Sequence, residues 1–157
     1  IKFFLKLRFP EELARVCQCL NSYAAKIEEE KGFFTVTFRD IPFALTDGKT
    51  YKEALQEAVD CLGEALASCI VDNEDIPMPS PACHREILIT PPAMVAAKAA
   101  LYIVSREAGL SKSALAMKLG VSEAVGRRLL NPRCQTKIIN IDKALAVMGK
   151  RIVIGIA

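Results

Sequence analysis

The sequence predicts an α+β protein made of a strand-rich N-terminal domain and a helical C-terminal domain. Three observations indicate this class. Apolar residues alternate early in the chain, helical periodicity dominates its second half, and prolines cluster between the two. The charge also divides: acidic side chains outnumber basic ones by seven in residues 21–90, and basic ones outnumber acidic ones by eight in residues 91–157. This asymmetry predicts a C-terminal domain that binds a polyanion and an N-terminal domain with another role.

An antiparallel hairpin is expected at the start of the first domain. Ala24–Ile27 and Gly32–Phe38 flank the polar turn Glu28–Lys31, and every second residue from Phe34 to Phe38 is apolar. A further short strand is expected at Ala44–Thr46, before Asp47-Gly48, a pair that favours positive φ. The first domain therefore has about three antiparallel strands.

One long amphipathic helix is expected to follow these strands. Thr50 and Glu53 form a capping box, in which the Thr hydroxyl accepts from the amide three residues on and the Glu reaches back. Apolar residues then recur at helical spacing from Leu55 to Ile70, and the acidic cluster Asp72–Asp75 ends the helix. A strand meander crossed by one helix is a small α+β layer.

The prolines of Ile76–Pro81 and Pro91-Pro92 predict a linker at residues 78–92, because proline lacks the N–H that helices and central strands need. Glu86–Thr90, inside this linker, is expected to be a short strand. The predicted organisation is listed here: an N-terminal extension at 1–20, a first domain at 21–77, the linker at 78–92 and a second domain at 93–157.

The second domain is predicted to be helical. Helices are expected at Ala93–Ala108, Ser111–Leu119, Ser122–Leu130 and Ile141–Met148, each ended by Gly or by Asn-Pro. The chain then runs into an apolar strand, Arg151–Ile156. Since this strand is polar on neither face, we expect a partner chain or another element to cover it, and a homodimer or higher homo-oligomer is the predicted assembly.

Residues 111–131 predict a helix-turn-helix. Ala116 is small where two helices cross closely, Gly120 can adopt the left-handed conformation of the sharp turn, and Ser122 caps the second helix. The first turn of that second helix would enter the major groove of DNA. Gly126 is expected to weaken it, because Gly in a helix interior costs about 1 kcal/mol relative to Ala.

Basic side chains around this motif predict DNA binding. Exposed residues at the start of the second helix can reach base edges, and the remaining cations can meet phosphates. The residues expected to contact DNA are Lys112, Ser122, Glu123, Ala124, Arg127, Arg128, Arg133 and Lys137. A helical pair with a merely solvated basic face is the alternative that the motif leaves open.

No catalytic residues, metal site or cofactor are expected. The chain has a single histidine, which excludes most His-based catalytic sets, and Glu53, Glu57, Asp60 and Glu64 have the spacing of a solvated helix face. The six cysteines are expected to be reduced thiols, with no paired spacing typical of zinc. Neither a transmembrane helix nor a signal peptide is expected, so the predicted location is cytoplasmic.

Residues 22–157 resemble the HicB antitoxin family. The resemblance is carried by Gly32–Pro42 with Ala44–Gly48, by the helix start Tyr51–Ala58, by the acidic proline-rich segment Asp72–Pro81, and by short C-terminal matches. These C-terminal matches are Leu119–Ser122, Leu129–Asn131, Thr136–Ile138 and Met148–Lys150.

The resemblance implies an antitoxin that binds and neutralises a HicA-type mRNA-cleaving toxin and represses its own operon. It implies a partial ribonuclease-H-like fold for the first domain, without a working carboxylate set, and an operator DNA as second partner. Toxin contacts are expected at Phe34, Asp40, Ile41 and Pro42. Two alternatives stay open: a stand-alone helix-turn-helix regulator whose first domain senses a ligand or dimerises, and a nuclease.

Overall fold

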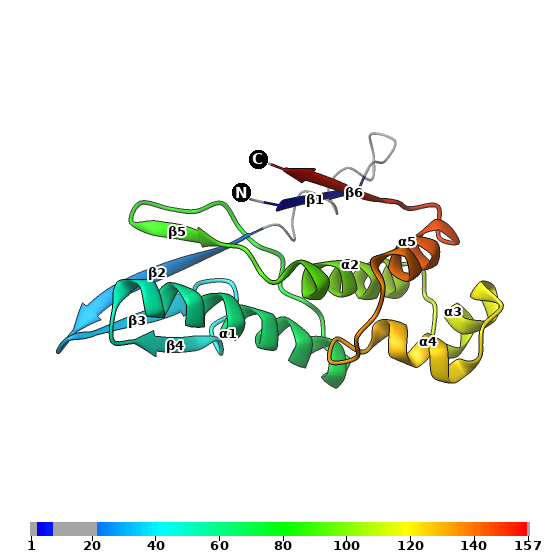
Figure 1. The fold of residues 1–157 in the computed structure, drawn as a ribbon, viewed down its shortest axis with the longest axis horizontal. Coiled ribbons are helices and arrows are strands. Elements are labelled where there is room, and N and C mark those ends of the chain that lie inside the picture. Colours follow the sequence, from blue (N-terminus) through cyan, green and yellow to red (C-terminus); the bar gives the residue numbers. More distant parts are fainter. Residues whose placement is uncertain (1–2, 8–21, 157) are drawn as a thin grey trace.

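The computed structural model describes residues 3–7 and 22–156 of the chain (Figure 1). The elements, in chain order, are β1 (Phe3–Leu7), β2 (Tyr23–Glu30), β3 (Phe33–Phe38), β4 (Leu45–Gly48), α1 (Tyr51–Asp72), β5 (Glu86–Ile89), α2 (Ala93–Glu107), α3 (Lys112–Leu119), α4 (Glu123–Leu130), α5 (Ile138–Ala146) and β6 (Ile152–Ile156). The predicted α+β class is confirmed.

The N-terminal sheet has four antiparallel strands in the order β4-β3-β2-β5. The predicted three-strand meander is therefore one strand short. The short strand expected inside the linker is present as β5, and it pairs with β2 so that Tyr23 lies opposite Ile89. A prediction from local pattern could find this strand but not its partner, which lies some sixty residues away in the chain.

The hairpin of β2 and β3 turns on two residues. Lys31 and Gly32 have φ of 52° and 82°, and two successive positive φ values match the right-handed twist of a hairpin. Strand β2 thus continues to Glu30, and the turn is shorter than the expected Glu28–Lys31. The inward-facing residues Val36 and Phe38 are buried as the alternation predicts.

Helix α1 packs along the sheet and contacts β3, β4 and β5 (Figure 1). The Thr50 hydroxyl accepts from the Glu53 amide at 3.1 Å, as predicted, while the Glu53 carboxylate accepts from the Lys49 amide at 2.9 Å. Gly48 lies directly against the first turn, because a Cβ there would be 2.4 Å from the Ala54 nitrogen. The strand-to-helix turn therefore requires glycine at this position.

The C-terminal half packs around α2, which contacts α1, α4 and α5. The predicted helices are all found, with α5 beginning three residues earlier than expected and ending two residues earlier. Buried residues of both halves, among them Leu66 of α1 and Leu101 of α2, form one hydrophobic cluster. The division into two domains at residues 78–92 stays a prediction, but the core is continuous across it.

The predicted C-terminal strand is confirmed as β6, and it pairs with β1 of the same chain, with Leu5 opposite Ile154. From the sequence, the strand is expected to be covered by a partner chain or by another element of the chain. The second of these is found, because β1 lies beside β6. Residues 8–20 of the predicted N-terminal extension lie outside the described residues, and a homo-oligomer stays a prediction.

Residues 73–86, which we call the strap, form hydrogen bonds and ion pairs with the rest of the fold at several points. At its start, the Arg106 guanidinium donates to the Asn73 carbonyl at 2.8 Å and pairs with Asp75 at 2.9 Å, and the Tyr102 hydroxyl donates to the Glu74 carbonyl at 2.8 Å. Side chains of α2 therefore hold the first residues of the strap in place.

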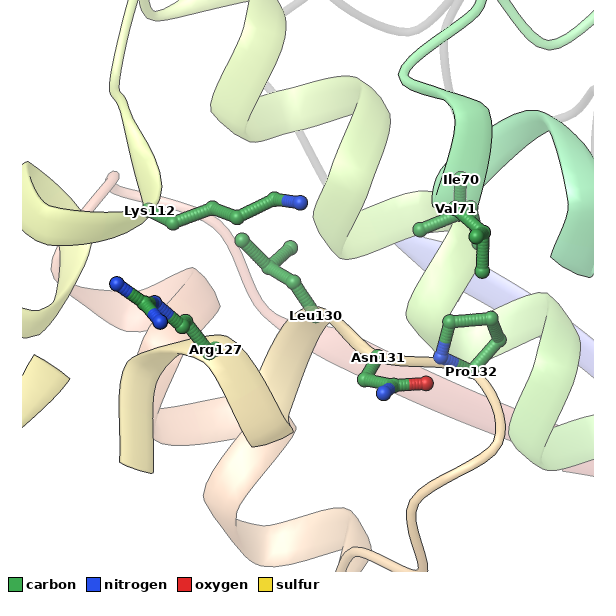
Figure 2. Close-up of a pocket in the computed structure, with 7 residues that line it drawn as sticks. All are labelled: Ile70, Val71, Lys112, Arg127, Leu130, Asn131 and Pro132. Carbon is green, nitrogen blue, oxygen red and sulfur yellow. The ribbon is translucent and has the colours of Figure 1, made fainter. Parts of the chain in front are cut away.

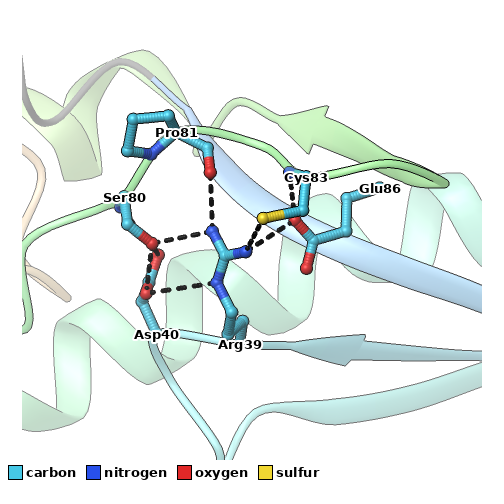
Figure 3. Close-up of polar contacts among 6 residues, drawn as sticks. All are labelled: Arg39, Asp40, Ser80, Pro81, Cys83 and Glu86. Carbon is cyan, nitrogen blue, oxygen red and sulfur yellow. Dashed lines mark hydrogen bonds and ion pairs between the residues drawn. The ribbon is translucent and has the colours of Figure 1, made fainter.

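The other end of the strap is held by the residues that follow β3 (Figure 3). Asp40 accepts from the Ser80 amide at 2.8 Å and from its hydroxyl at 2.7 Å. Arg39 donates to the Pro81 carbonyl at 2.7 Å and to Glu86 at 2.9 Å. The proline-rich segment thus follows one path over the sheet.

The crossing of α3 and α4 gives Gly126 a packing role. A Cβ at this position would lie 2.6 Å from the Ala116 Cβ and 3.2 Å from the Lys112 carbonyl oxygen. From helix propensity alone, Gly126 is expected to weaken α4. The structure corrects that expectation, because α4 can approach α3 this closely only with glycine there.

Replacing Gly126 with Ala tests this crossing. Helix propensity alone predicts a gain of about 1 kcal/mol. Overpacking costs about 1–3 kcal/mol, so we expect the free energy of unfolding to fall by a net of about 0–2 kcal/mol in urea denaturation. In an Ala116→Gly background the same change should destabilise less. A Gly126→Ala variant more stable than wild type would contradict the packing role.

The Asp40–Ser80 contact predicts a pH dependence of stability. Burial alone would raise the pKa of Asp40, but hydrogen bonds from Ser80 and the charge of Arg39 outweigh it and lower that pKa. Its ionised form therefore stabilises the fold above the ordinary Asp pKa of about 3.9, and this contribution is lost as pH falls through the lower folded-state value.

We therefore expect Asp40→Asn to unfold at lower urea concentration than wild type at neutral pH, and the difference to shrink at acidic pH. Asp47→Asn, a change at an exposed carboxylate of β4, is the matched control and should show little effect. A wild-type-to-variant difference that stays constant from neutral pH to about pH 2.5 would exclude the ionised contact as its cause.

Candidate functional site

The first candidate site is the exposed side of α3 and α4. The Ser111 and Ser122 hydroxyls cap these helices by accepting from amides three residues on, at 3.1 and 3.4 Å. Gly120, with φ of 64°, ends α3 and leads through a three-residue turn into α4. The helix limits and caps predicted from the sequence are confirmed here.

All eight residues predicted to contact DNA are exposed, as listed here: Lys112, Ser122, Glu123, Ala124, Arg127, Arg128, Arg133 and Lys137. Five of them gather on the N-terminal cap and the body of α4. Lys112 adds a cation from the start of α3, and Lys137 is the N-terminal cap residue of α5. The structure thus brings most of the predicted set onto one helix and its immediate neighbours.

The acidic residue of this group is paired. Arg127 donates to the Glu123 carboxylate one helical turn before it, and this hydrogen bond lowers the pKa of Glu123. The negative charge at the start of α4 is therefore compensated within the helix. The pair also orients the Arg127 guanidinium, which remains well exposed.

A cavity of about 280 Å³ lies beside the same helices (Figure 2). Its wall combines Ile70 and Val71 from the end of α1, the last residue of α4 with the two that follow it (Leu130, Asn131 and Pro132), and the cations Lys112 and Arg127. Nearby, Arg133 pairs with Glu64 of α1 at 3.7 Å. The basic side chains of α3 and α4 therefore adjoin the end of the acidic helix α1.

The second candidate site is the acidic surface of the N-terminal half. The side chains of Glu53, Glu57, Asp60 and Glu64 are exposed along α1, as a solvated helix face predicts. Glu28–Glu30 add three exposed carboxylates at the end of β2. Because the carboxylates of α1 face solvent along one helix, the surface of α1 suits a basic partner.

The four predicted toxin contacts differ in access. Pro42 is exposed, and Phe34 is half-buried with its ring edge-on to Tyr51 at 6.0 Å between centroids. Asp40 is occupied by the strap. Ile41 is 0 % exposed and belongs to the core, so its side chain is not available to a partner. It anchors the loop from inside, which the sequence pattern alone does not reveal.

Two residues that matter for these surfaces carry no recognisable signal in the sequence. Lys98, in the middle of the Ala-rich helix α2, is fully buried and reaches the carbonyls after α4. Arg39 joins β3 to the strap. Neither stands in a motif, and only the tertiary contacts identify them.

Among residues 3–7 and 22–156, no group of three or more His, Cys, Asp or Glu is arranged to hold a metal ion. Cys61, Cys69, Cys83 and Cys134 are free thiols, and Cys17 and Cys19 lie outside the described residues. Burial raises the pKa of Cys61 and Cys69. No helix in the described part of the chain has the length and apolar character needed to span a membrane.

Comparison with known proteins places these features in a family. The family described as "HicB_like antitoxin of bacterial toxin-antitoxin system" matches residues 22–100, which include the whole N-terminal sheet, α1 and the first half of α2. The match thus covers the acidic surface and the strap.

Curated relatives extend the similarity to the C-terminal half. The chain is 33% identical to antitoxin HicB of Pseudomonas fluorescens (strain Pf0-1) over 135 residues, which are 85% of this chain and 92% of that protein. It is 35% identical to antitoxin HicB of Escherichia coli (strain K12) over 122 residues, 78% of this chain and 88% of that protein. Antitoxin HicB 1 of Photorhabdus laumondii is 35% identical over 128 residues, covering 82% of this chain and 81% of that protein.

The resemblance first drawn from short segments therefore holds over most of the chain and with several separate relatives. This chain belongs to the HicB family of antitoxins from bacterial toxin-antitoxin systems.

Proposed function

We propose that the protein neutralises a HicA-type mRNA-cleaving toxin through its N-terminal half and represses its own operon through α3 and α4, which act as a helix-turn-helix. The observation that carries the proposal is the pairing, in one antitoxin chain, of an acidic α+β surface with a capped, exposed helix surrounded by arginines. In this function the chain works in the cytoplasm as a homodimer or higher homo-oligomer.

The DNA-binding part of the proposal rests on α4. Its N-terminal turn is exposed and its buried side packs on α3, as required of a helix that enters the major groove. Arg127, with the exposed Ala124 and Glu123 beside it, faces the base edges. Arg128 and Lys137 meet phosphates, which supply affinity without sequence information.

The toxin-binding part rests on charge and on the family. A toxin that binds RNA is expected to carry a basic surface, and the carboxylates of α1 and β2 offer it a complementary one. The N-terminal sheet with α1 is a partial ribonuclease-H-like fold in this proposal. Its role is to bind the toxin, and Pro42 and Phe34 supply apolar contacts beside the acidic groups.

The proposed roles of the two arginines make a test of repression. Arg127→Ala should weaken binding to the DNA upstream of the protein's own gene by about 1–3 kcal/mol and relax its sequence preference, because it loses base contacts. Arg128→Ala should weaken binding to all sequences alike and reduce the slope of log affinity against log salt by about one. Both are measured by fluorescence anisotropy.

Lys52→Ala, which removes one exposed cation from α1, is the matched control for charge and should bind this DNA as wild type does. If the Arg127 and Arg128 variants bind like the Lys52 control, α4 is not the DNA-contacting helix.

Charge reversal on α1 tests the acidic surface. Glu57→Lys with Asp60→Lys should slow association with the toxin encoded by the adjacent gene, because electrostatic steering raises association rates strongly at low salt. Stopped-flow kinetics across ionic strength measures this. Glu107→Lys, at an exposed carboxylate at the end of α2, is the control. A wild-type association rate that does not change with salt would remove the electrostatic part of the proposal.

A further inference from the structure

Lys98 of α2 is the one charged side chain that is buried within residues 22–152, with 0 % exposure. A buried ammonium normally pairs with a carboxylate, since an unpaired charge in the interior is costly. No ion pair joins Lys98 to a carboxylate in the described part of the chain. Burial accordingly lowers the pKa of Lys98. Some other interaction must hold the charge.

Three backbone carbonyls hold it. The Lys98 Nζ donates to the carbonyl oxygens of Arg128 at 3.5 Å, of Asn131 at 2.5 Å and of Cys134. An ammonium has three N–H donors, so all three are used. Arg128 stands in the last turn of α4, where free carbonyls carry partial negative charge that favours a cation.

The three carbonyls belong to one chain reversal. Residues 128–134 run from the last turn of α4 into the loop toward α5, and that loop has no helix or strand of its own. Three carbonyls of this stretch, those of Arg128, Asn131 and Cys134, converge on a single atom of α2, the Lys98 Nζ. The side chains of the same stretch, Arg128 and Arg133, point outward and are exposed.

We propose that Lys98 is a positioning residue for the DNA-contacting surface: its ammonium sets how the loop carrying Arg133 leaves the end of α4. The inference rests on the proposed function of α3 and α4 and names the interior group that fixes their geometry. Lys98 does not touch DNA. It acts through the backbone of residues 128–134, while the packing of Gly126 on Ala116 holds the other side of α4.

An apolar side chain would avoid the desolvation cost of the ammonium, but it would leave the carbonyls of Arg128, Asn131 and Cys134 without this donor. A loss of stability on replacing Lys98 is therefore expected in any case and does not by itself identify a positioning role. A role in fixing the path of the loop requires a multiple donor, because only such a group can hold three carbonyls to one point.

The test compares Lys98→Met with wild type in the full-length chain. Binding to DNA from upstream of the gene is measured across salt concentrations, and toxin binding is measured in parallel. We expect the Met variant to bind this DNA at least tenfold more weakly and to show a salt slope lower by about one to two, because Arg128 and Arg133 lose their places against phosphates. Toxin affinity should stay unchanged.

Two further variants separate positioning from general destabilisation. Leu101→Ala removes a buried side chain from the same helix, and it should lower stability while leaving the salt slope at the wild-type value. Lys98→Arg keeps the charge and several donors and should recover part of the lost affinity and slope. If Lys98→Met does not fold, Lys98→Gln, with two N–H donors and no charge, takes its place with the same expectations.

The outcomes are distinct. Wild-type protein that binds no upstream DNA at any salt concentration overturns the proposed function, and the role of Lys98 with it. Wild-type protein that binds, with a Met or Gln variant of unchanged affinity and slope, overturns only the role of Lys98. A slope that falls equally in Leu101→Ala also overturns it, since general loosening would then explain the effect.

Discussion

The contact between α1 and α2 is the interaction on which the rest of this structure depends. Gly63 of α1 faces Pro92, the residue that opens α2, and a Cβ on Gly63 would lie 3.1 Å from the proline ring. The two helices thus meet where a larger residue would push them apart. From this junction the buried residues of the sheet and those of the C-terminal helices form one core. The side chains of both candidate sites are therefore placed relative to this core.

This junction changes the meaning of the proline-rich segment. Prolines at this density predict a linker between independent domains, and the chemistry of proline supports that interpretation locally. Yet the strap is bound by Arg106 and Tyr102 at one end and by Arg39 and Asp40 at the other. Proline restricts the unfolded chain as well, so a proline-rich path that is also fastened loses less entropy on folding. The segment joins the two halves along a defined route.

The sequence predicted the local features well because their causes are local. Capping by Thr50, Ser111 and Ser122 depends on atoms within four residues, and these helix starts are confirmed. The pairing of β5 with β2, the burial of Ile41 and the reach of Lys98 depend on segments distant in the chain. Gly126 shows the difference most clearly. Its propensity suggests a defect, whereas its neighbour across the helix crossing makes it necessary.

The acidic and basic halves of the chain share one hydrophobic core, so their charged surfaces have a fixed position relative to each other. Acidic side chains line α1, basic ones surround α4, and the two surfaces meet at the pair of Glu64 with Arg133. The carboxylates of α1 repel a polyanion, and the cations around α4 repel a basic protein. Under the proposed function, each partner is therefore directed to its own surface before contact. Under the same proposal, α1 and α2 hold the two surfaces in one arrangement, and each partner would contact its own set of side chains.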